Sequence, residues 1–435
     1  MTHCLFIPLD GRPCNARFPM ELARLGGHSL QSPESRLLGN AKQPAALKAL
    51  DRWLAAVCEM HSEQESLALF LSLDTWLYGN LVASRKSTQT LAQVLERLAQ
   101  LRQLKAKYPQ LKIYTMGTLL RLSNSNDDTE ERPYWAQYGE KIYRYSWLTH
   151  YLQEHSEATA EVQELEALSE VIPEEVLADY QALRQRNLNV LEAVFEGLQS
   201  GWLELCLLGC DDGGQYGWNV QEKAHLRRLR DSLQLQDKLM IYPGADELGS
   251  VLMARVLVPD SYTLKLEWTS PTARHEHTRY EGIPLFDTLS AQAEACQIAL
   301  QDEKHAADTD GILWIHNAPQ NSVQIDQFLD REQRTVIAED RYQALSKTLK
   351  GTLPVMVADV VYANGGDAHL LEYLDEHTQF LDLAGYAAWN TTGNTLGYVL
   401  AWYKFYLYHR QHHSASDSRL PQRLLMERLC DDGLY

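Results

Sequence analysis

Short apolar runs, each followed directly by a cluster of polar residues, recur along the whole chain. In the clearest case, at 205–214, the letters LCLLGC precede DDGG. An uncharged apolar run of this length, flanked by glycine, is typical of a buried strand in a parallel sheet. Segments with helical periodicity separate the runs, and strands that alternate with helices form parallel βαβ units. The sequence therefore predicts an α/β protein.

The pattern predicts nine strands, and their number bears on the choice between a closed and an open sheet. They are 4–9, 66–73, 112–120, 205–210, 238–242, 261–268, 311–315, 354–358 and 380–384. Eight or nine parallel strands in one chain favour a barrel with helices outside. We therefore predict a (β/α)8 TIM-like barrel that spans residues 1–435 as a single domain, with the polar strand ends gathered on one rim.

One segment interrupts this alternation. Residues 127–200 are rich in Glu, Gln, Leu and Ala and poor in Gly, which predicts several helices with acidic outer faces. We interpret the segment as a helical insertion after the third strand. It could serve as a lid, as the interface of a homo-oligomer or as a spacer.

Composition and charge argue against several classes of protein. The 435 residues carry a formal net charge of −18, with a pI of about 5.3, which argues against nucleic acid or an anionic membrane surface as the main partner. No apolar window reaches the roughly 18 residues of a membrane span, and the first letters, MTHCLFIP, lack the pattern of a signal peptide. The sequence contains neither GxGxxG nor GxxxxGK[ST], so we expect no bound nucleotide. We assign no cofactor.

The cysteines indicate a reducing compartment. There are seven, scattered from Cys4 to Cys430, which does not suit a disulfide framework. Cys206 and Cys210 lie in a predicted strand, without Cys or His partners at the spacing of a zinc site. We therefore predict a cytoplasmic protein with reduced thiols.

Two adjacent carboxylates, Asp211 and Asp212, follow the clearest strand. A carboxylate without a partner is costly to bury, so the pair is expected where the strand leaves the sheet. In parallel α/β proteins this carboxyl edge is where ligands bind. Two close carboxylates also shift each other's pKa, so that one can stay ionised while the other donates a proton. Asp211 and Asp212 are therefore the predicted catalytic residues, although DDGG is also favourable turn chemistry.

The other strand ends supply candidate substrate-binding residues that mix carboxylates, amides and aromatic rings. Carboxylates and amides form hydrogen bonds with hydroxyl groups, and aromatic rings stack on the apolar face of a sugar, so the set suits a small carbohydrate. The candidates are Asp10, Arg12, Asp74, Tyr78, Arg121, Asp246, Glu247, Asn317, Asp359, Asn364, Asp367, Trp389 and Asn390.

Structural interpretations of several candidates stay open. Asp10 and Arg12 could form an ion pair, and Trp389 could belong to the core. Asp246 and Glu247 could cap a helix. Residues 393–394, close to Trp389 in the sequence, could cap the start of the last helix.

A metal site is an alternative use of the same carboxylates. Asp10, Asp211, Asp246 and Asp359 could together bind Mg²⁺ or Mn²⁺ through oxygen ligands. The close histidine pair at 275–277 lies in a charged segment, and we interpret it as solvated surface rather than as a zinc site. We therefore assign no metal ligand.

Four motifs resemble one bacterial family. They are PLDGRP at 8–13, the segment from SLD at 72–74 to ASR at 83–85, GADE at 244–247 and WNTTGNTLG at 389–397. Together they resemble the family catalogued as domain of unknown function 4127, over nearly the whole chain. This resemblance implies no activity.

A second and more remote resemblance covers about half of the chain. The order DD at 211–212, WTSP at 268–271, WIHNAP at 314–319 and WN at 389–390 is similar to the strand ends of retaining O-GlcNAcase (β-N-acetylglucosaminidase) barrels. The chain departs from them in having Ser270 for Gly and His316 where those enzymes favour an acid or amide. It also has an extra strand that carries Asp359 and Asn364.

This second resemblance implies substrate-assisted catalysis, in which the 2-acetamido oxygen attacks the anomeric carbon. Asp211 would orient the acetamido N–H, and Asp212 would protonate the leaving oxygen and then activate water. Asn317 and Asn390 would bind the sugar, with Trp268 and Trp389 packed around its ring.

The sequence thus leads to one main hypothesis about function. We expect a glycoside hydrolase, hexosaminidase-like, that acts on a small glycoside or aminosugar. Two alternatives use the same residues: a metal-dependent hydrolase or lyase on a sugar acid or polyol, and a non-catalytic sugar-binding protein.

Overall fold

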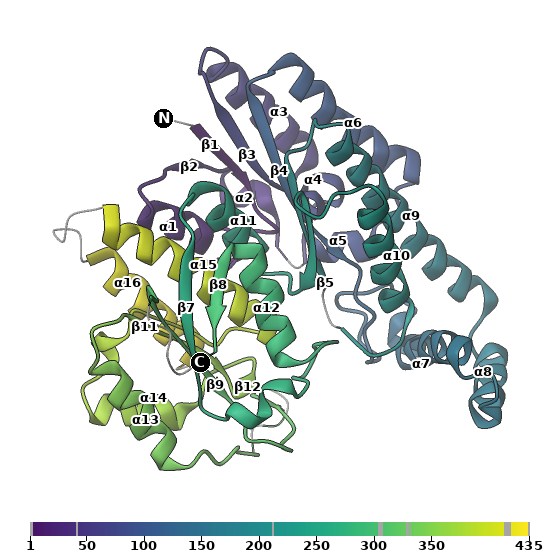
Figure 1. Ribbon diagram of the computed structural model, residues 1–435. Helices are drawn as coiled ribbons and strands as arrows, with labels where there is room; N and C mark the ends of the chain where they lie inside the picture. Colours follow the sequence, from purple (N-terminus) through teal and green to yellow (C-terminus); the bar gives the residue numbers. More distant parts are fainter. Residues whose placement is uncertain are drawn as a thin grey trace. The chain divides into compact units, whose positions relative to one another are not determined.

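A computed structural model describes residues 3–40, 42–210, 213–302, 308–327, 330, 332–412 and 419–433 (Figure 1). Its contacts divide the chain into two compact units. The first unit comprises Met1–Ala16 and Leu30–Ile241, and the second comprises Arg17–Ser29 and Tyr242–Tyr435. Each unit is built around its own sheet.

The first unit contains a six-stranded sheet in the order β2-β1-β3-β4-β5-β6. The strands are β1 His3–Ile7, β2 Leu30–Gln31, β3 Leu67–Ser72, β4 Leu111–Leu119, β5 Leu205–Cys210 and β6 Leu239–Pro243. The pairs from β2 through β5 are parallel. Every residue of β3, β5 and β6 is buried, as continuous apolar runs predict for the strands of a parallel sheet.

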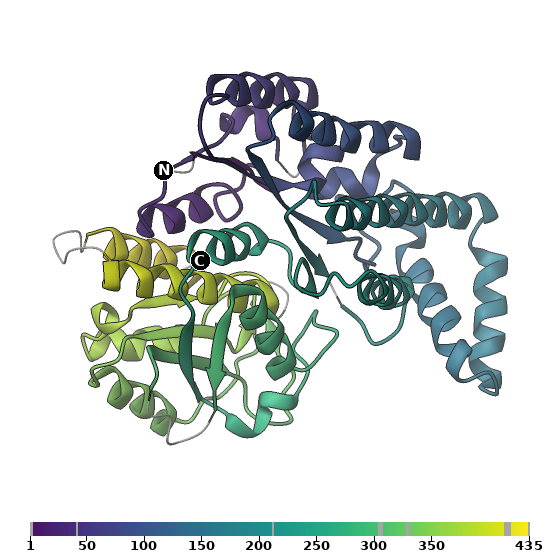
Figure 2. The same ribbon diagram turned by 45° about the horizontal axis from the view of Figure 1, so that its top comes forward.

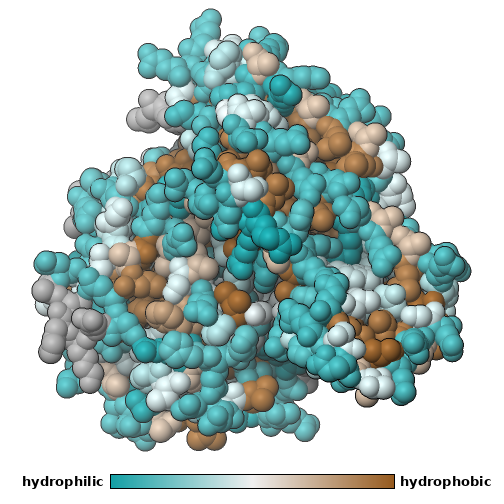
Figure 3. Space-filling model, turned by 45° about the vertical axis from the view of Figure 1, so that its right-hand side comes forward, coloured by the Kyte–Doolittle hydropathy of each residue, from teal (hydrophilic) through white to brown (hydrophobic). Residues whose placement is uncertain are grey.

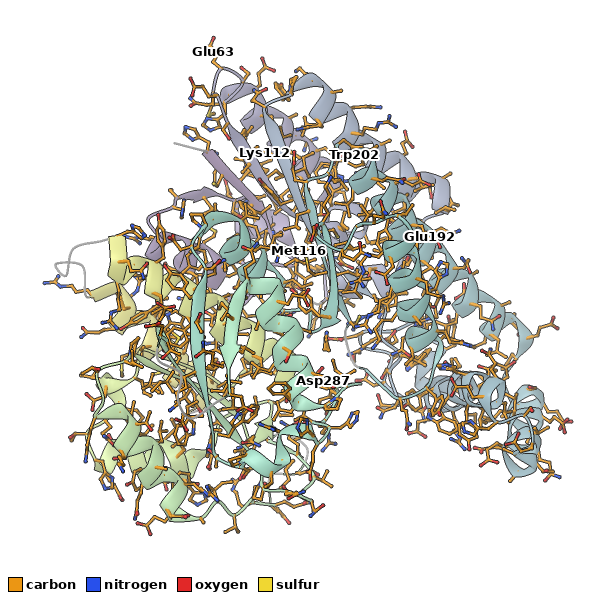
Figure 4. The ribbon with its side chains drawn as sticks, in the orientation of Figure 1. Glu63, Lys112, Met116, Glu192, Trp202 and Asp287 are labelled. Carbon is orange, nitrogen blue, oxygen red and sulfur yellow. The ribbon has the colours of Figure 1, made fainter. Side chains whose placement is uncertain are left out.

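Four helices cover one face of this sheet: α3 Leu47–Met60, α6 Leu91–Lys107, α9 Glu174–Gln199 and α10 Trp218–Ser232 (Figures 1 and 2). Their apolar stripes form one cluster with alternate strand residues, and Trp202 packs against it (Figure 4). Thr90 begins α6 with a reciprocal capping box to Gln93. The short helices α2 Ser35–Leu38, α4 Leu73–Tyr78 and α5 Leu81–Lys86 complete the layer near the strand ends.

The segment 127–200 contains α7 Trp135–Glu154, α8 Thr159–Val171 and the long α9. A separate small core joins α7 to α9, where the rings of Trp135 and Tyr180 lie 4.7 Å apart between centroids. None of the residues of α8 is buried, and α7 and α8 extend beyond the sheet as a helical hairpin (Figure 2). The predicted helices are present, between β4 and β5.

The second unit contains a five-stranded sheet in the order β13-β11-β9-β7-β8, with parallel pairs throughout. The strands are β7 Tyr262–Trp268, β8 Ile298–Gln301, β9 Gly311–Asn317, β11 Val355–Val360 and β13 Gly385–Ala387. Two short strands, β10 Ile325–Asp326 and β12 Tyr362–Ala363, pair with each other beyond the ends of β9 and β11.

Helix α15, Thr392–His412, is buried along most of its length and packs on β11 and β13. Such a helix must be covered on all sides, and α1 Arg17–Leu25, α11 Leu248–Leu257 and α12 Leu285–Cys296 contact it. Helices α13 Glu339–Leu349 and α14 Ala368–Glu376 pack together, and right-handed crossovers place them on the other face of the sheet. The unit also contains η1 Pro271–His275, η2 Phe380–Asp382, α16 Arg419–Arg428 and a π-helical turn at Leu429–Gly433.

The two sheets have the same topology. Counted along the chain within each unit, the strand order is 2-1-3-4-5, and the first sheet adds one further strand. In doubly wound sheets of this order, ligands bind beyond the carboxyl ends of the strands, at the point where the winding reverses. That point lies between β1 and β3 in the first unit and between β7 and β9 in the second.

The α/β class is confirmed, but the prediction of a closed barrel is wrong. The same local alternation of strand and helix occurs in barrels and in open sheets, which differ only in strand pairing. The short edge strands β2 and β8 were missed, and they give each sheet its reversal of winding. The segment predicted as the ninth strand, 380–384, instead contains η2 and precedes β13.

On the face shown in Figure 3, the described surface is mostly hydrophilic, with apolar groups in separate patches. Within the described residues, no helix combines the length and the apolar character that a membrane crossing requires.

Candidate functional site

Asp10 and Arg12 lie directly after β1 and form an ion pair. One oxygen of Asp10 accepts hydrogen bonds from the Arg12 backbone N–H at 2.9 Å and from Asn15 Nδ2 at 3.1 Å. The other oxygen accepts from Arg12 Nε at 2.9 Å. Asp10 is buried, whereas the side chain of Arg12 is 36 % exposed. The ion pair therefore stabilises the turn after β1, at the point where the winding reverses. The guanidinium group of Arg12 is partly exposed to solvent there.

Asp74 lies in the first turn of α4, which begins immediately after β3. Both of its carboxylate oxygens accept hydrogen bonds from Thr118 near the end of β4, one from the backbone N–H and one from Oγ1, each at 3.0 Å. Burial raises the pKa of Asp74 to about 7, although the Thr118 bonds and the nearby guanidinium of Arg85 act in the opposite direction. Asp74 can therefore exchange a proton near neutral pH.

Arg121 belongs to a cluster of charges beside Asp74. Its Nε lies 2.9 Å from Glu131, and its Nη2 lies 3.1 Å from Glu130. Arg85 reaches the same Glu130 oxygen at 2.8 Å. Neither glutamate was among the predicted site residues, although both follow the third predicted strand in the polar run SNSNDDTEER at 123–132. Arg121 thus lies just beyond the carboxyl end of β4, with acidic partners that were not predicted.

Tyr78, the last residue of α4, is buried, and the guanidinium carbon of Arg186 lies 5.1 Å from the centre of its ring. Burial raises its pKa well above the usual range. Tyr78 is therefore a neutral hydroxyl group within the helical layer.

The predicted catalytic residues Asp211 and Asp212 lie outside the described residues. The strand before them, β5, ends at Cys210, and its register pairs Gly209 with Thr118 and Cys210 with Leu119. The last described residues of β5 therefore lie beside the Thr118 backbone that contacts Asp74.

Hydrogen bonds and ring contacts hold residues 216–218 against α7. Gly217 donates its backbone N–H to His150 Nδ1 at 3.1 Å, and Trp218 donates to Ser146 Oγ at 2.7 Å. The ring of Tyr216 meets Tyr151 edge-on, with 5.2 Å between centroids. The helical insertion therefore holds the segment that leads from the end of β5 into α10.

At the winding reversal of the second unit, Asn317 joins the ends of β9 and β7. Its Oδ1 accepts the Ser270 backbone N–H and its Nδ2 donates to the Ser270 carbonyl, each at 3.0 Å. This buried amide therefore links the ends of the two strands through the backbone of Ser270, and its contact with a sugar stays a prediction.

His316 lies between two partners in the same buried edge. Its Nε2 lies 3.0 Å from Asp367 Oδ2, and its Nδ1 lies 2.7 Å from Thr269 Oγ1. Tyr342 donates its hydroxyl to the same Asp367 oxygen at 2.8 Å. His316 and Asp367 are each 1 % exposed. In the sequence, His316 stands out only as a departure from a family pattern, and Tyr342 could not be predicted because it lies in a helix rather than at a strand end.

Asp359 is connected to this group. Its Oδ2 accepts the Asp367 backbone N–H at 2.7 Å and the Tyr386 hydroxyl at 2.8 Å. Burial raises the pKa of Asp359 to about 6. Burial also acts to raise the pKa of Asp367, but its hydrogen bonds to His316 and Tyr342 outweigh this and lower it. Two predicted carboxylates thus lie in one buried network with opposite shifts.

Gly366 leaves the room that this network needs. A Cβ atom at Gly366 would overlap the hydroxyl oxygen of Tyr386. We expect Gly366→Ala to destabilise the protein by about 1–3 kcal/mol, the usual cost of overpacking, as measured by urea unfolding. In a Tyr386→Phe background, which removes the overlapping oxygen, the same substitution should cost clearly less. An equal cost in both backgrounds would show that the overlap is not its cause.

Asn390 and Asn364 lie in the segments that follow β13 and β12 in the second unit. Asn390 Nδ2 donates to Asp246 Oδ2 at 3.0 Å, and its carbonyl accepts the Asn364 N–H at 2.9 Å. Asn364 Nδ2 donates to Asp326 at 2.8 Å. Both asparagines have φ near +60°, a conformation that asparagine tolerates better than most residues. Trp389, beside them, is half-buried.

Glu247 does not lie at a ligand-accessible edge. It is 1 % exposed, and Gln292 of α12 donates Nε2 to its Oε1 at 2.9 Å. Burial raises its pKa to about 8. Asn394 Oδ1 accepts the backbone N–H groups of Ala245 and Asp246, so the start of α15 fixes this turn. The contact of Glu247 with substrate stays a prediction, and in the structure the carboxyl group packs among helices.

Of the four aspartates of the metal hypothesis, Asp211 lies outside the described residues, and the other three have partners of their own. Asp10 belongs to the first unit and is paired with Arg12, whereas Asp246 and Asp359 belong to the second and have separate partners. Over the described ranges, no group of three or more His, Cys, Asp or Glu side chains is arranged to bind a metal ion. His275 and His277 are exposed, in agreement with their interpretation as surface.

Comparison with known families gives one nearly full-length result. The family model described as "Protein of unknown function (DUF4127)" matches residues 4–435. A search of curated proteins found no match. The resemblance carried by the motifs at 8–13 and 389–397 is thus confirmed, and no named relative supports the resemblance to O-GlcNAcase barrels.

Proposed function

The chain belongs to the DUF4127 family, proteins of unknown function, and from the geometry of its sheet edges we propose that it is a glycoside hydrolase. The proposed catalytic centre lies at the carboxyl edge of the six-stranded sheet, with Asp212 as the general acid and base and Asp211 as an ionised carboxylate that stabilises the developing charge. One observation carries the proposal: β5, which leads directly into this pair, ends in register with β4 beside the contact between Thr118 and Asp74. Doubly wound sheets bind their ligands at this edge.

The described residues of this edge suit a polyhydroxylated substrate. The guanidinium of Arg12 and the cluster of Arg121 with Glu130 offer hydrogen-bond donors and acceptors without a phosphate-binding glycine loop. Asp74, with its pKa near neutrality, adds a group that can exchange a proton. Side chains that include both hydrogen-bond donors and acceptors are suited to binding sugar hydroxyl groups.

In the proposed mechanism, Asp212 gives its proton to the leaving oxygen as the bond from that oxygen to the anomeric carbon breaks. If the substrate carries a 2-acetamido group, its carbonyl oxygen forms a bond to the anomeric carbon, and ionised Asp211 stabilises the charge on the acetamido nitrogen. Asp212, now ionised, then takes a proton from the water that opens this intermediate. The oxygen of the product's anomeric hydroxyl group thus comes from water, the bond from the acetamido oxygen breaks, and Asp212 recovers its proton.

The class of reaction is tested by offering the wild-type protein a panel of 4-nitrophenyl glycosides, with and without EDTA. We expect hydrolysis that survives EDTA, with β-GlcNAc and β-GalNAc among the substrates. Activity that EDTA abolishes would contradict metal-free catalysis and favour a metal-dependent hydrolase. Absence of turnover with every member of the panel would contradict the glycosidase proposal, and tight binding without turnover would favour a sugar-binding protein.

A further inference from the structure

The loop that follows β9 forms a cavity that the proposed catalytic centre does not use. The cavity has a volume of about 530 Å³, and its polar lining includes Arg279, Ser322, Gln324, Asp330, Arg334 and Thr335. All of these residues belong to the second unit. The loop contains β10, which pairs with β12 beyond the end of β11, so the cavity lies on the carboxyl side of the five-stranded sheet.

The floor of the cavity is fixed by buried hydrogen bonds. Gln324 is 4 % exposed, donates Nε2 to the Val360 carbonyl at 2.8 Å, and accepts the Arg279 backbone N–H at 2.8 Å. The backbone N–H of Thr335 donates to the Tyr362 hydroxyl at 3.0 Å. The loop is thus bonded to β11 near its start and to β12 near its end, so a ligand would meet a formed site.

The charges of the lining are unbalanced. Among the described residues that line the cavity, two carry a guanidinium group, Arg279 and Arg334, and one carries a carboxylate, Asp330, which gives them a net charge of +1. Arg279 Nη1 lies 2.7 Å from Asp330 Oδ2. Arg334 is exposed, and its hydrogen bond to Gln327 is long, at 3.4 Å. A positive cavity in a chain of net charge −18 favours anions locally, because the guanidinium fork matches carboxylate and phosphate oxygens.

We propose that this cavity binds a small anionic polyol, a sugar that carries one carboxylate or phosphate group, with Arg334 on the anionic group and the amide and hydroxyl residues on the sugar hydroxyls. The volume lies within the range of sites for small molecules. This binding site is independent of the glycosidase proposal, because it lies in the second unit and needs no catalysis.

The test is isothermal titration of the full-length protein at about 50 mM salt with glucuronate, glucose 6-phosphate, glucose and inorganic phosphate. Low salt is chosen because screening weakens interactions between exposed charges. At least one of the two anionic sugars should bind at least about tenfold more tightly than glucose and than inorganic phosphate, and the preferred sugar identifies the anionic group. Equal affinity for glucose, or binding of inorganic phosphate as tight as that of the anionic sugars, would overturn the proposal.

Three variants test the assignment of residues. Arg334→Gln should weaken binding of the preferred ligand at least about tenfold, whereas Asp330→Asn should strengthen it, because it removes the only negative charge among the described lining residues. Arg341→Gln, an exposed arginine on α13 that does not line the cavity, should leave affinity unchanged. Arg334 is exposed, so its replacement should leave the melting temperature without ligand unaltered. Unchanged affinity in Arg334→Gln would refute the site even if Asp330→Asn fails to fold.

Discussion

Replacing Arg184 with leucine is expected to destabilise the protein by about 3–5 kcal/mol, the cost of removing one partner of a buried ion pair. Arg184 on α9 is 3 % exposed, and its Nε and Nη2 donate to the two carboxylate oxygens of Glu222 at 2.8 and 2.6 Å. The same guanidinium donates to the carbonyl oxygens of Leu120 and Arg121, just beyond β4, at 3.0 and 2.9 Å. Leucine would remove the donors of a largely buried carboxylate and of two carbonyl groups at the carboxyl edge.

Arg144 provides a matched control for this prediction. It also makes a two-pronged pair, with Glu164 at 2.8 and 2.6 Å, but the two side chains are 38 % and 43 % exposed. Exposed pairs contribute at most about 1 kcal/mol. Urea unfolding should therefore show a much larger loss for Arg184→Leu than for Arg144→Leu. Equal losses would mean that burial and the carbonyl contacts of Arg184 do not set its contribution.

The second large effect is a dependence of stability on pH that comes from Glu247. Its pKa is raised from an ordinary value of 4.5 to about 8 by burial, and its Oε2 lacks a hydrogen-bond partner among the described residues. The folded protein therefore keeps the proton on Glu247 at pH values where the unfolded chain has released it. As pH rises from about 4.5 to about 8, the unfolded state is progressively favoured, so stability present at low pH is lost across this window.

Glu247→Gln removes this titration and keeps the shape of the side chain. The free energy of unfolding of the variant, relative to wild type, should rise with pH between 5 and 8 by up to about 1.4 kcal/mol per unit. The change should level off above pH 8. Glu376→Gln, at an exposed position of the same unit, serves as the control and should show no such trend. If the free energy of unfolding changed with pH in the same way in the wild type and in Glu247→Gln, the assignment of a neutral Glu247 would be contradicted.

Much of the fold could be predicted because short stretches of sequence determine where strands and helices form. The apolar run at 205–210 coincides with β5, and the runs at 66–73 and 311–315 lie within about two residues of β3 and β9. The closure of the sheet could not be predicted, because it depends on which strands pair. The two residues of β2, Leu30–Gln31, are too few to give a periodic signal, yet their pairing with β1 creates the edge of the first sheet.

The candidate site shows the same division between local and tertiary information. The sequence correctly located polar strand ends at Asp10, Asp74 and Asn317, since each follows an apolar run. It could not show that Asp74 would be buried against Thr118, because that depends on α4 starting at Leu73 and on the neighbour that β4 supplies. The network around His316 joins strand ends to α13 across many residues, so spacing along the chain gave no sign of it.

The measurement that tests the central claim most directly is the ratio of kcat/KM of Asp212→Asn to that of wild type, on the best 4-nitrophenyl glycoside and with EDTA present. Asp237→Asn, an exposed aspartate before β6, is the matched control. The account predicts a loss of at least about a hundredfold for Asp212→Asn, the lower limit for removal of a general acid–base, and wild-type activity for Asp237→Asn. Wild-type activity in Asp212→Asn would contradict a catalytic centre at the end of β5.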